Sequence, residues 1–293
     1  MSAHASDAEA QTHRAHFSAI LAVYLLGLTI GGLYVGMVSP VRTVVQLGFG
    51  VDDSTGIWMI NIYTLFYAAL IPIIGKLADR HGRKLVFTVC VAIFAVGSLI
   101  CGLSEHFGGF GILLTGRVVQ AAGAGGMIPV ANAEMGTSFP PEKRGMALGM
   151  AAGIVGVANV LGAACGSAII GLVGTDNWAV MFYLAIPFCL LVIIGAIAFL
   201  PTSTVETEGR MDLFGSIFFA LFVLMLLLGL KAIDFFDFGA TIVQPGAWVP
   251  LVCAVISAFI FRIVEKNAQD PVFHLEYFHN RAIVITMAVS FFI

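Results

Sequence analysis

Eight apolar stretches, each long enough to cross the hydrocarbon core of a membrane, dominate this chain of 293 residues. They cover roughly 17–39, 56–75, 85–103, 108–137, 145–174, 178–200, 212–232 and 246–264. A membrane-spanning helix needs about 20 consecutive, mostly apolar residues. Charged residues make up only 11% of the sequence, which is too few to cover the surface of a soluble protein. We therefore predict an all-α, polytopic membrane helix bundle.

A ninth apolar stretch opens at Ala282 and is still apolar where the sequence stops, at Ile293. Twelve helical residues reach about 18 Å, whereas the hydrocarbon core is about 30 Å thick. We therefore expect eight complete transmembrane helices and a truncated ninth. The chain is expected to be either a fragment or the product of a truncated gene.

Composition argues against several other classes of protein. The net charge of −3 gives no basic surface for nucleic acid. The five cysteines lie in apolar runs without a CxxC pair, so neither a disulfide framework nor a metal site is expected. The seven histidines are scattered in loops, with no HExxH pattern and no Ser/His/Asp set beside the spans. We expect no enzyme activity and no cofactor.

The basic residues favour one orientation. Lys and Arg gather in the cytoplasmic loops of membrane proteins. If the amino terminus is cytoplasmic, eleven of the fourteen basic residues lie on the inside, two lie outside, and Arg117 lies within a span. The polar start of the chain, with no small-residue cleavage site after the first span, argues against a cleaved signal peptide. We predict a multi-pass protein of the cell membrane with a cytoplasmic amino terminus.

The most specific motif follows the second span, where residues 75–84 read G-K-L-A-D-R-H-G-R-K. A loop that only fixed the orientation would need bases but no particular Asp or Gly. The run resembles the G-x-L-a-D-r-x-G-r-k signature of the major facilitator superfamily. Residues 117–123 resemble that family's second motif, with Ala121 where the family has glycine.

Four further segments resemble the 14-helix drug:proton antiporter branch of that family; they are residues 139–145, 178–187, 211–215 and 270–281. The branch implies an exporter of small amphipathic or drug-like solutes that works by alternating access in the lipid bilayer, with protons as the coupling ion. A chain without the second half of such a transporter could instead be a transport-dead partner or regulator.

The spans and the resemblance together imply five parts. Residues 1–16 form a cytoplasmic tail, 17–200 a six-helix bundle, 201–211 a cytoplasmic linker, 212–265 two inserted transmembrane helices, and 266–293 a cytoplasmic loop with the truncated start of a second bundle.

Two departures from the branch weaken proton antiport as a mechanism. The antiporter motif G-P-x-x-G-G reads G-A-A-C-G-S at residues 162–167, without the proline or the last glycine. The branch usually has an Asp in the first helix, near the position of Gly31 or Gly32, but the first span here contains no acid. The proton-binding acid is therefore expected in the missing carboxy-terminal half. Transport without coupling is the alternative.

A cytoplasmic charge relay is implied by the family signature. Asp79 and Arg83 lie in the signature loop with Gly75 and Gly82, and Glu134 lies near the cytoplasmic end of the fourth span. Arg83 could bridge Asp79 and Glu134, as this family does to close its cytoplasmic side. Alternatively, Glu134 is an interfacial acid that meets water.

Arg117 is the candidate centre of the transport path. It lies roughly 10 Å from the outer end of its span, and a charge near the bilayer centre costs about 2.5–3.5 kcal/mol. We expect it to face the bundle interior; snorkelling with carbonyl pairing is the alternative. The other residues expected along the path are Gln120, Tyr34, Asn61, Tyr63, Tyr67 and Asn159.

The fifth span is rich in glycine, and small residues at regular spacing let helices approach closely. We expect this helix to be packed between neighbours. The glycines expected at its contacts are Gly153, Gly156, Gly162 and Gly166.

Overall fold

The computed structural model describes residues 2–202, 213–234, 236–267 and 285, with residues 2–16 and Leu213 described by their backbone alone. Helices make up nearly all of these residues, and there is no strand among them. Eight helices are long and apolar enough to cross a membrane, which confirms the predicted all-α, polytopic architecture. Apart from Ile285, the predicted ninth span lies outside the described residues.

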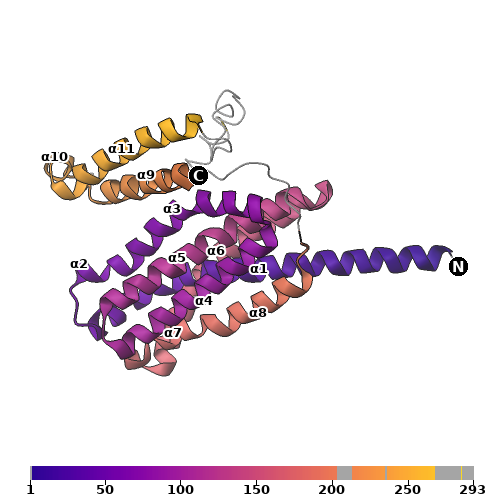
Figure 1. The fold of residues 1–293 in the computed structure, drawn as a ribbon. Helices are drawn as coiled ribbons and strands as arrows, with labels where there is room; N and C mark the ends of the chain where they lie inside the picture. Colours follow the sequence, from indigo (N-terminus) through magenta and orange to yellow (C-terminus); the bar gives the residue numbers. More distant parts are fainter. Residues whose placement is uncertain (1, 203–212, 235, 268–284, 286–293) are drawn as a thin grey trace. The chain divides into compact units, whose positions relative to one another are not determined.

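The chain divides into two compact units, Met1–Glu206 and Thr207–Ile293. The first unit contains α1 (Ser2–Gly48), α2 (Asp53–Gly56), α3 (Trp58–His81), α4 (Arg83–Phe107), α5 (Phe110–Thr137), α6 (Pro141–Val173), the 3₁₀ turn η1 (Thr175–Asn177), α7 (Val180–Tyr183) and α8 (Ala185–Phe199). Within it, α4 and α5 run side by side, α3 packs on α5, and α8 packs on α4 (Figure 1). The long helix α1 packs mainly along α6.

The second unit is a helical hairpin built from α9 (Leu213–Lys231) and α11 (Pro245–Asn267), with the short α10 (Phe238–Ile242) between them. The two long helices pack against each other, and the rings of Phe219 and Phe261 lie 5.2 Å apart across the contact. The predicted linker at 201–211 and the predicted loop from residue 266 onward fall almost wholly outside the described residues.

Two helices run further than the hydropathy pattern predicts. The first span was expected to end at residue 39, but α1 passes through Pro40 and ends at Gly48. The predicted loop at 75–84 is mostly helical, because α3 continues to His81 and α4 begins at Arg83. Gly82 alone makes the turn, with a φ of 88° that favours glycine. Charged residues thus form helix ends here rather than a loop.

Glycines bring α4 and α5 into backbone contact. A side chain at Gly123 of α5 would place its Cβ 2.5 Å from the carbonyl oxygen of Cys90, and one at Gly116 would lie 2.7 Å from the amide nitrogen of Cys101. A Cβ placed on Gly97 of α4 would lie still closer to the backbone nitrogen of Gln120. Such small residues allow the close helix approach that is typical of membrane bundles. The side chains of α5 are therefore held against α4 in one register.

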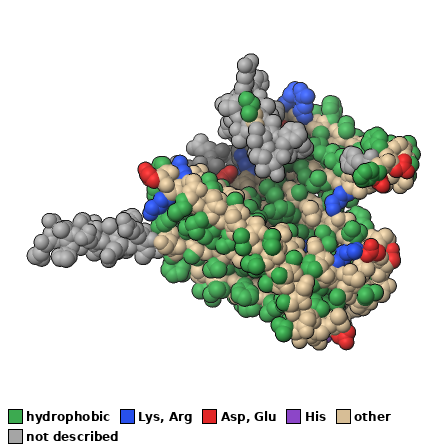
Figure 2. Space-filling model, turned by 180° about the vertical axis from the view of Figure 1, so that it is seen from behind, with side chains coloured by type: hydrophobic (Ala, Val, Ile, Leu, Met, Phe, Trp, Pro, Cys, Tyr) green, Lys and Arg blue, Asp and Glu red, His purple; other side chains and the backbone are tan. Residues whose placement is uncertain are grey.

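The outward faces of the helices are apolar. Val160, Leu172 and Ile194 are 74%, 87% and 65% exposed, although they lie on predicted spans. Figure 2 shows hydrophobic side chains spread over the face in view, with most charged side chains in small groups. An apolar surface of this extent suits contact with lipid rather than with water.

Candidate functional site

Arg117 lies in the interior of the first unit. Its side chain is 1% exposed, and the guanidinium carbon lies 4.0 Å above the centre of the Tyr63 ring. Its Nε donates a hydrogen bond to the carbonyl oxygen of Met59 at 3.0 Å, and its Nη1 donates to Oε1 of Gln120 at 2.5 Å. No carboxylate of the described residues pairs with it. The charge is therefore stabilised by a carbonyl, an amide and an aromatic face, and the side chain does not snorkel.

A hydrogen-bonded chain extends from Arg117 across to α4. Gln120 is fully buried, and its Nε2 donates to Oγ of Ser98 at 2.8 Å. The Ser98 hydroxyl in turn donates to the carbonyl oxygen of Phe94 at 2.9 Å. We call Arg117, Gln120, Ser98 and Tyr63 the Arg117 network. Sequence reasoning missed Ser98, although a serine beside Gly97 in the middle of an apolar span is a signal that could have found it.

Two tyrosines on α3 extend this network. The rings of Tyr63 and Tyr67 are stacked, with centroids 6.0 Å apart and planes 12° apart. The Tyr63 hydroxyl is buried and has no hydrogen-bond partner among the described residues. Asn61, predicted for the same path, lies partly buried two residues before Tyr63 on α3. A buried hydroxyl without a partner is costly unless something else binds it.

Two other residues predicted for the path, Tyr34 and Asn159, are not part of the Arg117 network. The Tyr34 hydroxyl donates to the carbonyl oxygen of Met181 at 2.6 Å, and its ring meets Phe94 edge-on. Tyr34 thus ties α1 to α7 and α4. Asn159 is exposed on α6, at the point where the α6 backbone comes closest to Gly36.

The structure brings Asp79, Arg83 and Glu134 together. Arg83 Nη1 lies 3.2 Å from Oε2 of Glu134, and Arg83 Nη2 lies 3.7 Å from Oδ1 of Asp79. The Glu134 side chain is 6% exposed, whereas that of Asp79 is 60% exposed. Arg83 also donates to the hydroxyl of Thr137, which sequence reasoning missed. We call Asp79, Arg83 and Glu134 the relay.

The two glycines of the signature differ in their surroundings. Gly82 precedes Arg83 at the turn between α3 and α4. Gly75 lies within α3, and a Cβ placed on it would meet nothing within 4 Å among the described residues.

Two further bases near the relay bind the ends of helices. Lys84 Nζ donates to the carbonyl oxygens of Ile197 and Leu200, at 2.9 and 2.7 Å. Arg144 Nη2 donates to the carbonyl oxygen of Thr137 at 2.8 Å. The last carbonyls of a helix have no partner within the helix, so these bases satisfy the ends of α8 and α5.

The predicted packing glycines of α6 fall into two groups. A Cβ at Gly162 would collide with the carbonyl oxygen of Leu33, and one at Gly166 would lie 2.5 Å from a carbonyl oxygen of α1. Gly153 and Gly156 have open space within 4 Å in the described part of the chain. Half of this helix therefore contacts α1 closely, while the other half presents small residues to an uncovered face.

Two neighbouring glycines of α1, Gly31 and Gly32, also differ in the space around them. A Cβ at Gly31 would meet nothing within 4 Å among the described residues. A Cβ at Gly32 would lie 2.8 Å from the carbonyl oxygen of Val155. Of these two positions, only Gly31 has room for a carboxylate.

In the part of the chain that the structure describes, no group of three His, Cys, Asp or Glu side chains is placed to hold a metal ion.

Comparison with known proteins identifies this arrangement of helices. The sequence model of the Major Facilitator Superfamily matches residues 24–293. The chain belongs to this superfamily. The fold and the family are those of membrane transporters that move small molecules.

Several curated members of the superfamily are similar over nearly the whole chain. An uncharacterized MFS-type transporter of Bacillus subtilis, YfiU, is 28% identical over 286 residues, which are 96% of this chain and 54% of that protein. The efflux pump dotC of Dothistroma septosporum is 32% identical over 284 residues, or 93% of this chain and 47% of that protein. The multidrug resistance protein 3 of Bacillus subtilis is 28% identical over 91% of this chain and 50% of that protein. The chain therefore spans about half the length of these relatives.

A solved structure agrees in fold. The inward-facing, occupied form of a bacterial homolog to the human lysosomal transporter Spinster matches with a TM-score of 0.58 and 21% identity. The match covers 89% of this chain and 64% of that one. At this identity the likeness concerns the fold alone.

Proposed function

We propose that the chain is the amino-terminal part of a 14-helix exporter that moves a small amphipathic solute by alternating access. The observation that carries this proposal is the Arg117 network, a charge buried in the bundle that no carboxylate of the described segments pairs with. Membrane-embedded charges mark substrate and ion pathways. The relatives named as an efflux pump and a multidrug resistance protein favour export of a drug-like solute.

The network offers two kinds of contact to such a solute. Arg117 and the unpartnered Tyr63 hydroxyl bind polar groups, and the stacked rings of Tyr63 and Tyr67 offer an aromatic face. Binding sites for small molecules combine a mostly apolar wall with a few polar groups of this kind. In this proposal, the exposed glycines Gly153 and Gly156 of α6 lie where the second half of the transporter packs.

The relay closes the cytoplasmic side in this proposal. Arg83 joins the turn between α3 and α4 to the end of α5, so breaking its pairs would free these ends to separate. The orientation follows from the basic residues, which gather at the relay end of the bundle. Residues 17–200 then form the first bundle, and residues 212–265 form two inserted helices in a protein of the cell membrane.

Proton coupling in this protein would need an acid outside the first helix. Gly31 has no group that can bind a proton, and Glu134 is already paired at the cytoplasmic end. We therefore place the coupling acid in the carboxy-terminal half, with uncoupled transport as the alternative. A transport-dead partner protein is the second candidate, because the chain spans about half the length of its relatives.

The test measures efflux of fluorescent amphipathic dyes from everted vesicles that contain the complete gene product. Arg117→Gln is expected to abolish transport, while Arg42→Gln, at a partly exposed base paired with Asp53, is the matched control and should retain it. Transport at the unchanged rate with Arg117→Gln would contradict the proposed path. Neutral substitution of each carboxy-terminal membrane acid, with and without a pH gradient, tests the coupling.

A further inference from the structure

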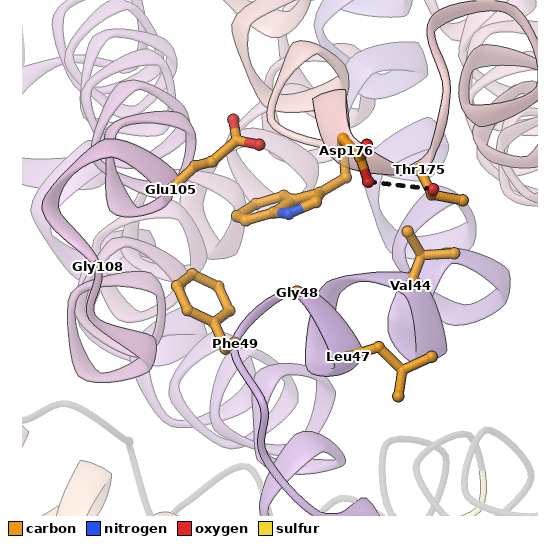
Figure 3. Close-up of a pocket in the computed structure, with 9 residues that line it drawn as sticks. Val44, Leu47, Gly48, Phe49, Glu105, Gly108, Thr175 and Asp176 are labelled. Carbon is orange, nitrogen blue, oxygen red and sulfur yellow. Dashed lines mark hydrogen bonds between the residues drawn. The ribbon is translucent and has the colours of Figure 1, made fainter.

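A large pocket lies at the end of the first unit that is furthest from the relay. Its volume is about 600 Å³, within the range of pockets that bind drug-sized ligands. The end of α1, the end of α4 and the segment around η1 form its walls (Figure 3). Because Arg83 starts α4 and Glu105 lies near its end, the relay and this pocket lie at opposite ends of one helix. The lining residues of this end pocket are Val44, Leu47, Gly48, Phe49, Glu105, Gly108, Thr175, Asp176 and Trp178.

The charge of the end pocket is negative. Of the described residues that line it, Glu105 and Asp176 alone carry a charge. Figure 3 shows their side chains on the same side of the pocket, while Leu47 lies across from them. The exposed imidazole of His106 is adjacent to Glu105, and the nearby Arg42 is already paired with Asp53 at 2.7 Å. A cation in the pocket would therefore meet two carboxylates and no competing lysine or arginine of the lining.

The remaining walls are aromatic. The rings of Phe49 and Trp178 lie 5.3 Å apart and are tilted by 58°. Gly48 and Gly108 line the pocket without side chains, which leaves room beside the two rings. Aromatic faces attract organic cations through their quadrupole as well as through apolar contact.

Gly48 allows the end of α1 to lie against the indole of Trp178. Trp178 is 3% exposed, and a Cβ placed on Gly48 would lie 3.0 Å from the indole nitrogen. The ring is therefore held in place at the wall of the pocket.

We propose that the end pocket binds an amphipathic organic cation, with Glu105 and Asp176 facing its charge and Phe49 and Trp178 facing its apolar body. Two carboxylates and an aromatic wall do not suit a hard metal ion, which takes six or more oxygen ligands. This binding does not depend on the proposed transport. Only its placement on the outer surface rests on the proposed orientation.

The experiment compares two probes of nearly identical size and shape but opposite charge. Tetraphenylphosphonium and tetraphenylborate are titrated by equilibrium dialysis against the 293-residue chain in nanodiscs, with empty nanodiscs as the blank. We expect the cation to bind at least tenfold more tightly than the anion. Equal affinity for the two ions would overturn the proposal.

Variants then locate the site. Glu105→Gln and Asp176→Asn are each expected to weaken binding of the cation about threefold, and the double variant about tenfold, as for partly exposed ion pairs. Asp52→Asn, an exposed acid outside the pocket lining, is the matched control and should bind like the unchanged protein. Circular dichroism of each variant checks that it remains folded. Unchanged affinity in the double variant would place the cation elsewhere and refute the site.

Discussion

Glu134→Gln should destabilise the first unit much more than Asp79→Asn, although both changes remove one acid from Arg83. The reason is burial, because Glu134 is 6% exposed and Asp79 is 60% exposed. At an effective dielectric constant of about 20, charges 3.2 Å apart attract by about 5 kcal/mol. In water, charges 3.7 Å apart attract by only about 1 kcal/mol. The attraction energies of the two ion pairs of Arg83 therefore differ severalfold before the cost of desolvation is included.

The net losses are smaller than these attractions. Arg83 is 20% exposed, so water can approach the guanidinium once Glu134 is neutral, and we expect Glu134→Gln to cost about 2 kcal/mol. Asp79→Asn should cost less than about 1 kcal/mol, as exposed pairs do. Arg83→Gln should cost most, about 3–5 kcal/mol, because it leaves the buried Glu134 charge without a partner. The Arg83→Gln/Glu134→Gln double variant should be no worse than Arg83→Gln, since members of one network are not additive.

The assay is equilibrium unfolding of the purified chain in mixed micelles of dodecyl maltoside and sodium dodecyl sulfate, followed by circular dichroism. Equal losses for Glu134→Gln and Asp79→Asn would refute the argument from burial. Fully additive losses in the double variant would show that Glu134 is an interfacial acid outside the relay.

Three other predictions follow from the same contacts. A single cysteine at position 80, in a background without native cysteines, should resist an impermeant maleimide in sealed cells, because Arg80 lies at the cytoplasmic end in the proposed orientation; rapid labelling would reverse that orientation. Gly31→Asp should fold and Gly32→Asp should not, as judged by size-exclusion chromatography, since only Gly31 has room for a side chain. Gly162→Ala should cost about 1–3 kcal/mol through collision with the α1 backbone, whereas Gly153→Ala, on the open face, should be neutral or stabilising in the same unfolding assay.

The spans could be predicted from the sequence because a membrane imposes length and composition on every helix that crosses it. Their number and order needed nothing beyond hydropathy. The interior position of Arg117 could be expected for a related reason, since lipid disfavours a charge that deep in the core. The contact of Arg83 with Glu134 was implied by a family signature. Hydropathy alone places both residues only near the same membrane surface.

The rest depends on contacts between helices that no local pattern encodes. Ser98 joins the Arg117 network because Gly97 lets α4 approach α5, and the Tyr34 hydroxyl binds a carbonyl oxygen on α7 rather than the network. The end pocket combines segments 44–49, 105–108 and 175–178, which are far apart in the chain. The two groups of glycines in α6 look alike in sequence. They differ because the backbone of α1 lies close to Gly162 and Gly166 but not to Gly153 and Gly156.

Arg117 has no carboxylate beside it in the part of the chain that the structure describes, and this bears on how the chain enters the membrane. Helix α5 has the lowest hydropathy of the eight described spans and carries a charge in its interior, so it partitions poorly into lipid by itself. The groups that stabilise the guanidinium outside α5 come from α3, through the Met59 carbonyl oxygen and the Tyr63 ring. Helix α3 is synthesised before α5 and is available when α5 leaves the translocon. Insertion of α5 is thus coupled to its first tertiary contact, because α3 supplies a carbonyl oxygen and an aromatic ring that stabilise the charge of Arg117 inside the membrane.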